Sequence, residues 1–258
     1  MSVQAQRADA LRALHVPGDP LVLVNAWDVA SALAVAAHPA CRAVATGSAG
    51  VAASLGWDDG EQMPVDEALA AVRRIAAAVD LPLTADLEAG YGDAAATAAG
   101  AIAAGAVGMN LEDADHAAGP AALVDPDAHA AAVARVVAAG QAAGVGVVVN
   151  ARTDVFLCEV GAPEHRVALA AERLNAYLAA GAACGFAPGL IDPDAIARLV
   201  RAVDGPVSVL ARPGAPRVAQ LAALGVARIS LGSYPFRSML DRTARFAAEV
   251  HERGTWPA

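Results

Sequence analysis

Three acidic residues and one arginine stand where apolar segments of the chain end. Asp86 and Glu88 close one segment, Glu112 closes the next, and Arg152 lies at the end of the one after. Three carboxylates meeting at one edge of a sheet would repel one another unless a cation lay among them. Oxygen ligands without His or Cys favour Mg²⁺, with Mn²⁺ as the other fit. Arg152 supplies a permanent positive charge and a planar fork for a carboxylate or a phosphate.

The spacing of Asp86 and Glu88 predicts that both side chains leave the same face of one strand, because side chains alternate along a strand. Other interpretations of these residues stay open. Arg152 could form a structural salt bridge with Glu112 or Asp154, and a single Asp after a strand, such as Asp28 or Asp154, often caps the next helix. The pattern as a whole favours a metal site.

The elements that would position these residues alternate regularly along the chain. Short runs rich in Val, Leu and Ile are typical of buried strands, and Ala-rich stretches of helical length follow them. Eight strands are predicted at 21–25, 43–46, 81–88, 106–112, 145–153, 183–188, 206–210 and 226–231. Eight helices are predicted at about 28–37, 64–79, 93–104, 126–143, 163–180, 192–203, 214–224 and 233–253.

This alternation predicts an α/β fold, a (β/α)₈ TIM barrel that occupies residues 1–258 as one domain. An open doubly wound sheet is the alternative, but no G-x-G-x-x-G motif follows the first predicted strand. A barrel collects its chemistry at the carboxyl ends of its strands, where the acidic residues and Arg152 stand. The last helix, about 233–253, has apolar residues that could face its own barrel or a neighbouring subunit.

Composition excludes several classes of function. The formal net charge is −9 and all eighteen basic residues are Arg. Because the chain has no surplus of basic residues to attract a phosphate backbone or an anionic membrane, we expect no nucleic-acid or membrane partner. Without Lys, a Schiff-base aldolase, a pyridoxal-phosphate enzyme and a Walker-type phosphate loop are excluded. The three widely spaced Cys and the absence of an apolar leader predict a cytoplasmic protein.

Five segments of the chain resemble the isocitrate lyase and phosphoenolpyruvate mutase superfamily, in the order in which that family carries them. They are Asn25-Ala-Trp-Asp28, the stretch 46–61 that begins Thr46-Gly-Ser-Ala-Gly, Ala85-Asp-Leu-Glu-Ala-Gly-Tyr-Gly92, Gly108-Met-Asn-Leu-Glu-Asp113 and Asn150-Ala-Arg-Thr-Asp154. The resemblance implies a (β/α)₈ barrel, a homo-oligomer (a tetramer or a dimer), Mg²⁺, and a small 2-oxo acid, enolpyruvate or dicarboxylate as ligand.

The resemblance also implies roles for single residues. Asp86 is similar to the family's main metal carboxylate, Glu88 stands where a second Asp is common, and Glu112 resembles a carboxylate that holds the metal through water. Asp59 resembles another acid of this shell. Arg152 resembles the cation that holds the substrate's carboxylate or stabilises its enolate.

The predicted substrate contacts come from the same motifs. The turn Gly47-Ser48-Ala49 resembles the loop whose N–H groups and hydroxyl bind the substrate carboxylate. Trp27 and Asn110, which stand in two other matching segments, are predicted substrate contacts as well, together with Arg152.

The chain departs from the family's lyases after Glu112. It lacks their Lys-(Lys/Arg)-Cys-Gly-His loop, and the mutases' His at the end of the sixth strand is replaced by Pro188. His116 is the candidate acid–base residue on this loop. We therefore predict a Mg²⁺-dependent enzyme that cleaves or forms a C–C or P–C bond through an enolate. The alternative is a non-catalytic or regulatory barrel that binds 2-oxo acids.

Overall fold

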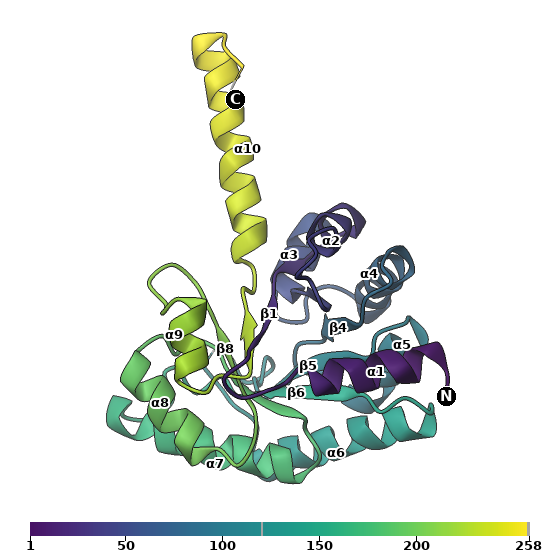
Figure 1. The fold of residues 1–258 in the computed structure, drawn as a ribbon, viewed down its shortest axis with the longest axis vertical. Coiled ribbons are helices and arrows are strands. Elements are labelled where there is room, and N and C mark those ends of the chain that lie inside the picture. The colour runs from purple at the N-terminus through teal and green to yellow at the C-terminus, as the bar shows by residue number, and fades with distance from the viewer. Residues whose placement is uncertain (120, 257–258) are drawn as a thin grey trace.

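A ring of parallel strands forms the centre of the molecule in the computed structural model, which describes residues 1–119 and 121–256 (Figure 1). The strands are β1 (Leu21–Leu23), β2 (Asn25–Ala26), β3 (Val44–Thr46), β4 (Leu83–Asp86), β5 (Gly108–Glu112), β6 (Val148–Arg152), β7 (Cys184–Ala187), β8 (Val207–Leu210) and β9 (Arg228–Ser230). Every pair is parallel, in the order β1-β9-β8-β7-β6-β5-β4-β3-β2. The predicted parallel α/β architecture is confirmed.

The first predicted strand appears as two short strands because Val24 interrupts it. β1 pairs with β9, and β2 pairs with β3. Since β1 and β2 are consecutive in the chain, this strand joins the two ends of the sheet and brings the ring close to a full barrel. Eight strand positions therefore surround the axis, as the sequence predicts.

Helices surround this ring. They are α1 (Val3–Ala13), α2 (Val29–Ala36), α3 (Ser48–Ser54), α4 (Val65–Ala78), α5 (Ala94–Ala103), α6 (Pro126–Ala142), α7 (Arg166–Ala179), α8 (Pro193–Ala202), α9 (Val218–Ala223) and α10 (Tyr234–Arg253), with a 3₁₀ turn at Pro163–His165. α1 and α3 were not predicted. The predicted cap is confirmed at Asp28, whose carboxylate accepts the Ser31 N–H at 2.7 Å.

α1 covers the end of the barrel opposite the predicted site. Arg12 donates to the carbonyl oxygens of Gly146 and Val147 just before β6, at 3.2 and 3.0 Å. Leu11 is fully buried, and a Cβ on Gly108 at the start of β5 would lie only 2.6 Å from its Cδ2 atom. A glycine at this position therefore lets α1 approach the strand and close the barrel.

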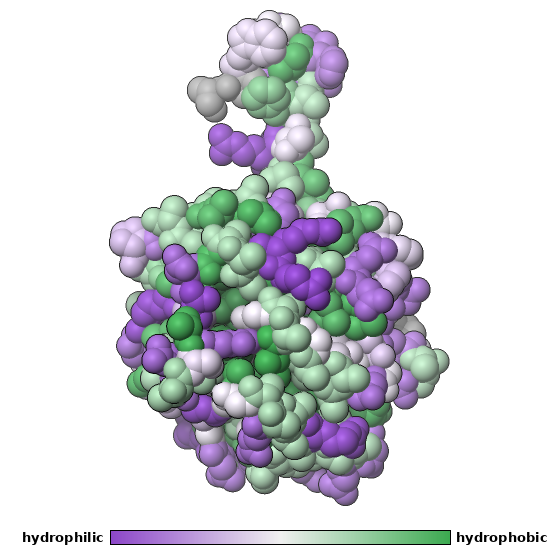
Figure 2. Space-filling view, turned by 90° about the vertical axis from the view of Figure 1, so that its right-hand side faces the viewer, coloured by the Kyte–Doolittle hydropathy of each residue, from purple (hydrophilic) through white to green (hydrophobic). Residues whose placement is uncertain are grey.

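α10 projects away from the barrel (Figures 1 and 2). Only its first turn packs closely, where Phe236 meets Trp27 edge-on with ring centroids 5.3 Å apart. Further along, Met239, Leu240 and Phe246 are 37, 47 and 48% exposed. Within residues 1–119 and 121–256, no helix combines the length and the apolar character needed to cross a membrane.

Candidate active site

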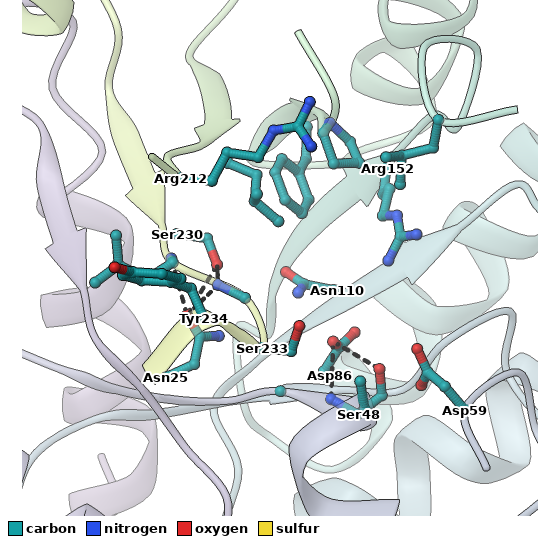
Figure 3. A pocket seen from close by; sticks show the side chains of 18 of the residues that line it. Asn25, Ser48, Asp59, Asp86, Asn110, Arg152, Arg212, Ser230, Ser233 and Tyr234 are labelled. Atoms are coloured by element: carbon teal, nitrogen blue, oxygen red, sulfur yellow. Dashed lines mark hydrogen bonds between the residues drawn. The ribbon is translucent and has the colours of Figure 1, made fainter. Parts of the chain in front are cut away.

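A cavity of about 480 Å³ opens at the carboxyl ends of the strands (Figure 3). It collects residues from β2, β4, β5, β6, β7, β8 and β9 and from the loops that follow the strands. Seven of the predicted site residues line it, namely Gly47, Ser48, Ala49, Asp59, Asp86, Asn110 and Arg152. The barrel topology thus brings together residues that are more than 100 positions apart in the sequence.

Asp86 ends β4 and is held by the turn that follows β3. The Ser48 N–H and hydroxyl both donate to its Oδ2 atom at 3.1 Å. Its own N–H donates to Thr46 Oγ1 at 2.9 Å. The other carboxylate oxygen, Oδ1, is buried and has no hydrogen-bond partner in the described part of the chain. Asp86 lines the cavity, and an unpaired carboxylate oxygen on such a residue is what a hard cation or an ordered water would satisfy.

Glu88 does not share the face of Asp86 as the sequence predicts. β4 ends at Asp86, and Glu88 has a left-handed backbone with φ of 52°. Its Oε2 accepts the N–H groups of Gly60 and Glu61, both at 2.7 Å, and its Oε1 accepts the Tyr91 hydroxyl at 2.8 Å. The same-face prediction was wrong because strand alternation stops where the strand stops.

The bonds of Glu88 anchor the loop that carries Asp59. Burial, and then the charge of Asp86, raise the pKa of Asp59 above its ordinary value. Burial also raises the pKa of Glu88, to about 7, against the opposing hydrogen bond from Tyr91. The solvent-accessible Asp59 and the buried Glu88 are two acids of raised pKa near Asp86, and they make this side of the site favourable for a cation.

Arg152 lies between two carboxylates. Its Nε and Nη2 donate to the two oxygens of Asp154 at 2.5 and 2.7 Å, and its Nη1 lies 2.5 Å from Glu112 Oε2. Although burial opposes it, these two carboxylates raise the pKa of Arg152 above its ordinary value. Both ion pairs considered from the sequence form, and Asp154 is an ion-pair partner of Arg152.

A buried hydrogen-bond network holds Asp154 in place. Its backbone N–H donates to Asp113 Oδ1 at 2.8 Å. The fully buried Asp113 also accepts the Tyr177 hydroxyl at 2.7 Å and an Arg173 N–H at 3.0 Å. This network fixes where Asp154 holds the guanidinium, since each donor and acceptor in it constrains the next.

His116 reaches the other oxygen of Glu112. Its Nε2 lies 3.0 Å from Glu112 Oε1, and this hydrogen bond raises the pKa of the imidazole despite partial burial. A smaller cavity of about 120 Å³ contacts Glu88, Glu112, His116 and Cys158. Ser48, Asp59 and Arg152 line both cavities, so His116 lies next to the larger one.

The three predicted metal carboxylates are not gathered into one ligand set. In the described ranges, no three His, Cys, Asp or Glu side chains are placed together as they would be around a metal ion. Glu88 and Glu112 are occupied by hydrogen bonds and ion pairs, whereas Asp86 keeps an unpaired oxygen in the cavity. The donor set, which consists of carboxylate oxygens, has the chemistry that Mg²⁺ prefers, and Asp86 is the member with an unpaired oxygen.

Trp27 lies outside the cavity. It packs on Phe236 and contacts a separate groove with Asp28 and Leu55. Conversely, sequence reasoning missed Phe186, Leu210, Tyr234 and Arg237, which line the cavity. Because Phe186 and Leu210 are apolar, the sequence indicates only that they belong to the core. Tyr234 and Arg237 lie on α10, a helix that the sequence places outside the ring of strands.

Comparisons with known proteins identify the family of this chain. The family model for phosphoenolpyruvate phosphomutase matches residues 11–251. An uncharacterized protein of Mycobacterium tuberculosis is 36% identical over 240 residues, which is 93% of this chain and 88% of that protein. A crystal structure of a "putative phosphonomutase" from Burkholderia cenocepacia is 41% identical with a TM-score of 0.89, over 95% of this chain and 99% of that one.

Two further solved structures, each 25% identical with a TM-score of 0.82, have more specific descriptions. One is 2,3-dimethylmalate lyase, a member of the PEP mutase/isocitrate lyase superfamily, which matches over 96% of this chain and 86% of its own. The other is phosphonopyruvate hydrolase in complex with oxalate and Mg²⁺, over 96% and 88%. The chain belongs to the PEP mutase/isocitrate lyase superfamily, a family of enzymes that act on C–C or P–C bonds.

Proposed function

We propose that this chain is a Mg²⁺-dependent enzyme that cleaves or forms a C–C or P–C bond beside the 2-oxo group of a small carboxylic acid. The observation that carries the proposal is the unpaired, buried Oδ1 of Asp86 in a cavity that also contains Arg152 and the Ser48 turn. Phosphonopyruvate hydrolase, a relative, was crystallised with Mg²⁺ and oxalate, which supports a divalent ion together with a small carboxylate.

The acidic side of the cavity would hold the metal. Asp86 is the direct ligand in this proposal, with Asp59, Glu88 and Glu112 acting through water. When bound, Mg²⁺ supplies Lewis-acid stabilisation of negative charge on the 2-oxo oxygen. Ser48 keeps Asp86 in place from the side, because two of its donors already bind the same oxygen at 3.1 Å.

Arg152 and the Gly47-Ser48-Ala49 turn would hold the substrate's carboxylate. The guanidinium is fixed by Asp154 and Glu112, so a substrate oxygen meets donors whose orientation has already been set. Such preorganisation stabilises charge that develops during the reaction more effectively than mobile groups do.

His116 is the proposed proton donor or acceptor in place of the missing Cys loop. Its hydrogen bond to Glu112 fixes the ring and favours the protonated form, as a general acid needs. The imidazole side chain is 28% exposed, so protons can exchange with solvent. A His116→Gln variant would bind ligand normally and lose turnover.

A thermal-shift series tests the proposal first. The protein is melted with oxalate, oxaloacetate or phosphonopyruvate, each with and without Mg²⁺, because a ligand that binds only the folded state raises the melting temperature. We expect a shift with oxalate only when Mg²⁺ is present, and turnover of one of the two 2-oxo acids. Absence of any shift would contradict the proposal, and binding without turnover would favour a regulatory barrel.

A further inference from the structure

A buried arginine lies beneath the cavity. It belongs neither to the hydrogen-bond network around Asp86 and Glu88 nor to the one around Arg152. Arg228 on β9 is 1% exposed, and none of the ion pairs within residues 1–119 and 121–256 includes it. Burial lowers the pKa of its guanidinium to about 10, so it remains charged near neutral pH. Burial of a cation without a carboxylate partner destabilises the folded state. The few hydrogen bonds of Arg228 therefore show which groups hold it in place.

One of these bonds goes to Asn110, which lines the cavity. Arg228 Nη2 donates to Asn110 Oδ1 at 3.1 Å, and Asn150 Nδ2 donates to the same oxygen at 2.7 Å. A guanidinium can only donate, so the oxygen of the Asn110 amide must face Arg228. The orientation of an amide is often ambiguous, but a donor-only neighbour removes the ambiguity at this position.

The amide nitrogen of Asn110 is consequently turned away from Arg228. Its two N–H groups find no acceptor in the described part of the chain, although Asn110 is only 6% exposed and lines the cavity. Near it, Asp86 Oδ1 also lacks a partner, and Asp86 and Asn110 are register partners on β4 and β5. In Figure 3 the Asn110 amide lies between Arg212 and Asp86.

His15 holds Arg228 from the opposite side. Its Nδ1 lies 2.9 Å from the Leu11 carbonyl oxygen and its Nε2 lies 3.4 Å from Arg228 Nη1. Burial, and then the charge of Arg228, lower the pKa of His15 to about 4. The neutral ring therefore donates from Nδ1 to Leu11 and accepts from Arg228 at Nε2, which links α1 to the floor of the cavity.

We propose that Arg228 is a positioning residue that locks the Asn110 amide with its N–H groups toward the cavity, so that the ligand must place an unprotonated oxygen over Asn110. A carboxylate or a 2-oxo group meets this requirement, whereas an ammonium group or another pure donor does not. The ligand class rests on the proposed function, but the orientation of the amide follows from the donors on Arg228 and Asn150. The charge of Arg228 further favours an anion above it.

Asn110→Asp tests the donor side of this proposal. The variant keeps an oxygen for Arg228 and Asn150 but loses the N–H groups that face the ligand. Oxalate is titrated calorimetrically at saturating Mg²⁺, and we expect binding about 10- to 100-fold weaker than in the wild type, as for loss of a hydrogen bond to a charged group. Gln141→Glu, the same chemical change at an exposed position of α6, is the control. Unchanged oxalate affinity in Asn110→Asp would overturn the proposal.

Arg228→Met and Arg228→Lys test the positioning role. Without donors at position 228 the amide can turn, so Arg228→Met should bind oxalate about tenfold more weakly, with Arg228→Lys recovering part of this loss. Arg201→Met on the surface of α8 is the matched control. Equal affinity of Arg228→Met and the wild type would overturn the role of Arg228.

A measurement without ligand separates this proposal from the proposed function. In the Arg228→Met background, a carboxylate at position 110 would be buried without its donor, so Asn110→Asp should lower the melting temperature more than it does beside Arg228. Equal decreases in the two backgrounds would overturn the lock. If the wild-type protein does not bind oxalate, the proposed function fails, and this comparison alone decides the arrangement of Arg228 and Asn110.

Discussion

The two sides of the cavity use arginine in opposite ways. On the β4–β6 side, Arg152 is clamped by Glu112 and Asp154 within 2.7 Å. On the β8–β9–α10 side, Arg212, Arg228 and Arg237 form no ion pair with the described residues, and Arg212 and Arg237 line the cavity directly. On the first side the charge of the arginine is compensated and its position is fixed by its carboxylate partners, while the second side offers unpaired positive charge.

This difference indicates a division of labour. A clamped arginine presents donors at fixed positions and contributes little net field, which suits the atoms that react. An unpaired arginine contributes charge that attracts an anion over some distance, and its side chain can adjust to the ligand. We therefore expect changes on the first side to affect turnover and changes on the second side to affect affinity.

The largest effect is expected at Arg152. Arg152→Met should reduce kcat/KM by about 10³-fold, because charged donors in a buried site are worth about 10²- to 10³-fold each. It also leaves Glu112 and Asp154 unpaired, which should lower the free energy of unfolding by about 3–5 kcal/mol. Steady-state kinetics and denaturant melts measure both effects, with Arg201→Met as the control. A variant that kept the wild-type rate would place the chemistry elsewhere.

Asp86 should decide metal affinity. Asp86→Asn is expected to weaken Mg²⁺ binding by at least about 100-fold, since changes in outer ligands alone cost about 10- to 100-fold. Glu88→Gln should cost less, because its carboxylate is already bound by Gly60, Glu61 and Tyr91. Calorimetric titration of Mg²⁺ compares them, with the exposed Asp66→Asn as control. The reverse order would make Glu88 the direct ligand.

On the β8–β9–α10 side, the free energy of unfolding should depend on pH through His15, which contacts Arg228. Burial, and then Arg228, lower the pKa of the folded-state imidazole to about 4, whereas the unfolded chain takes up its proton near 6.5. Stability is therefore full above pH 6.5 and decreases as the pH falls toward 4, by about 3 kcal/mol for this histidine at 1.36 kcal/mol per pKa unit.

The test compares melting curves between pH 4 and 7 for the wild type and two variants. His15→Gln should flatten the dependence on pH, while the exposed His38→Gln should leave it as it is. His129 is also buried with a pKa lowered to about 4 by burial, so part of the slope remains in His15→Gln. A slope unchanged by His15→Gln would show that His15 is not a group whose protonation destabilises the fold in this pH range.

Arg212 should affect affinity with little change in turnover. Arg212→Gln removes one exposed charge from the cavity wall, and an exposed ion pair is worth up to about 1 kcal/mol, or about fivefold in KM. Its effect should weaken as salt rises, because an exposed charge is screened. If kcat fell and KM stayed constant, the proposed division between the two sides would be wrong.

The smallest effect on ligand binding is expected from the outer part of α10. We propose that Met239, Leu240 and Phe246, which are exposed, pack on a neighbouring subunit. Replacing Met239 and Phe246 with Glu should lower the mass measured by light scattering, with the melting temperature of the barrel nearly unchanged. A wild-type protein that is already monomeric would contradict this arrangement.

Much of the fold could be predicted from the sequence because its signals are local. Alternating Val-rich and Ala-rich segments indicate buried parallel strands and covering helices, and residues after the strands mark the edge where a barrel places its site. Asp86, Ser48, Asn110 and Arg152 were found in this way, and all four line the cavity. α1 and α3 were missed, since one precedes the first strand and the other lies in a segment interpreted as a turn.

The contacts within the site could not be predicted, because they depend on where each strand ends and on partners far away in the sequence. Glu88 was placed beside Asp86 by strand spacing, yet its positive φ turns it toward Gly60 and Glu61. Trp27 matches a family motif, but packing against Phe236 takes it out of the cavity. A single dihedral angle or one aromatic contact was sufficient to change the role of each residue.

The sequence by itself determined the barrel, the edge that carries the chemistry and the exclusion of every mechanism that needs a lysine. Only the tertiary structure decided that Arg152 is held between carboxylates while Arg228 is unpaired, because Arg152 ends β6 and Arg228 begins β9, and the residues that surround each position come from other strands. Glu112 on β5 and Asp154 just after β6 bind Arg152, and Asp113 holds Asp154 in turn, whereas Arg228 meets an amide and an imidazole. Charge compensation is a property of spatial neighbours, and these are fixed only when the ring of strands closes.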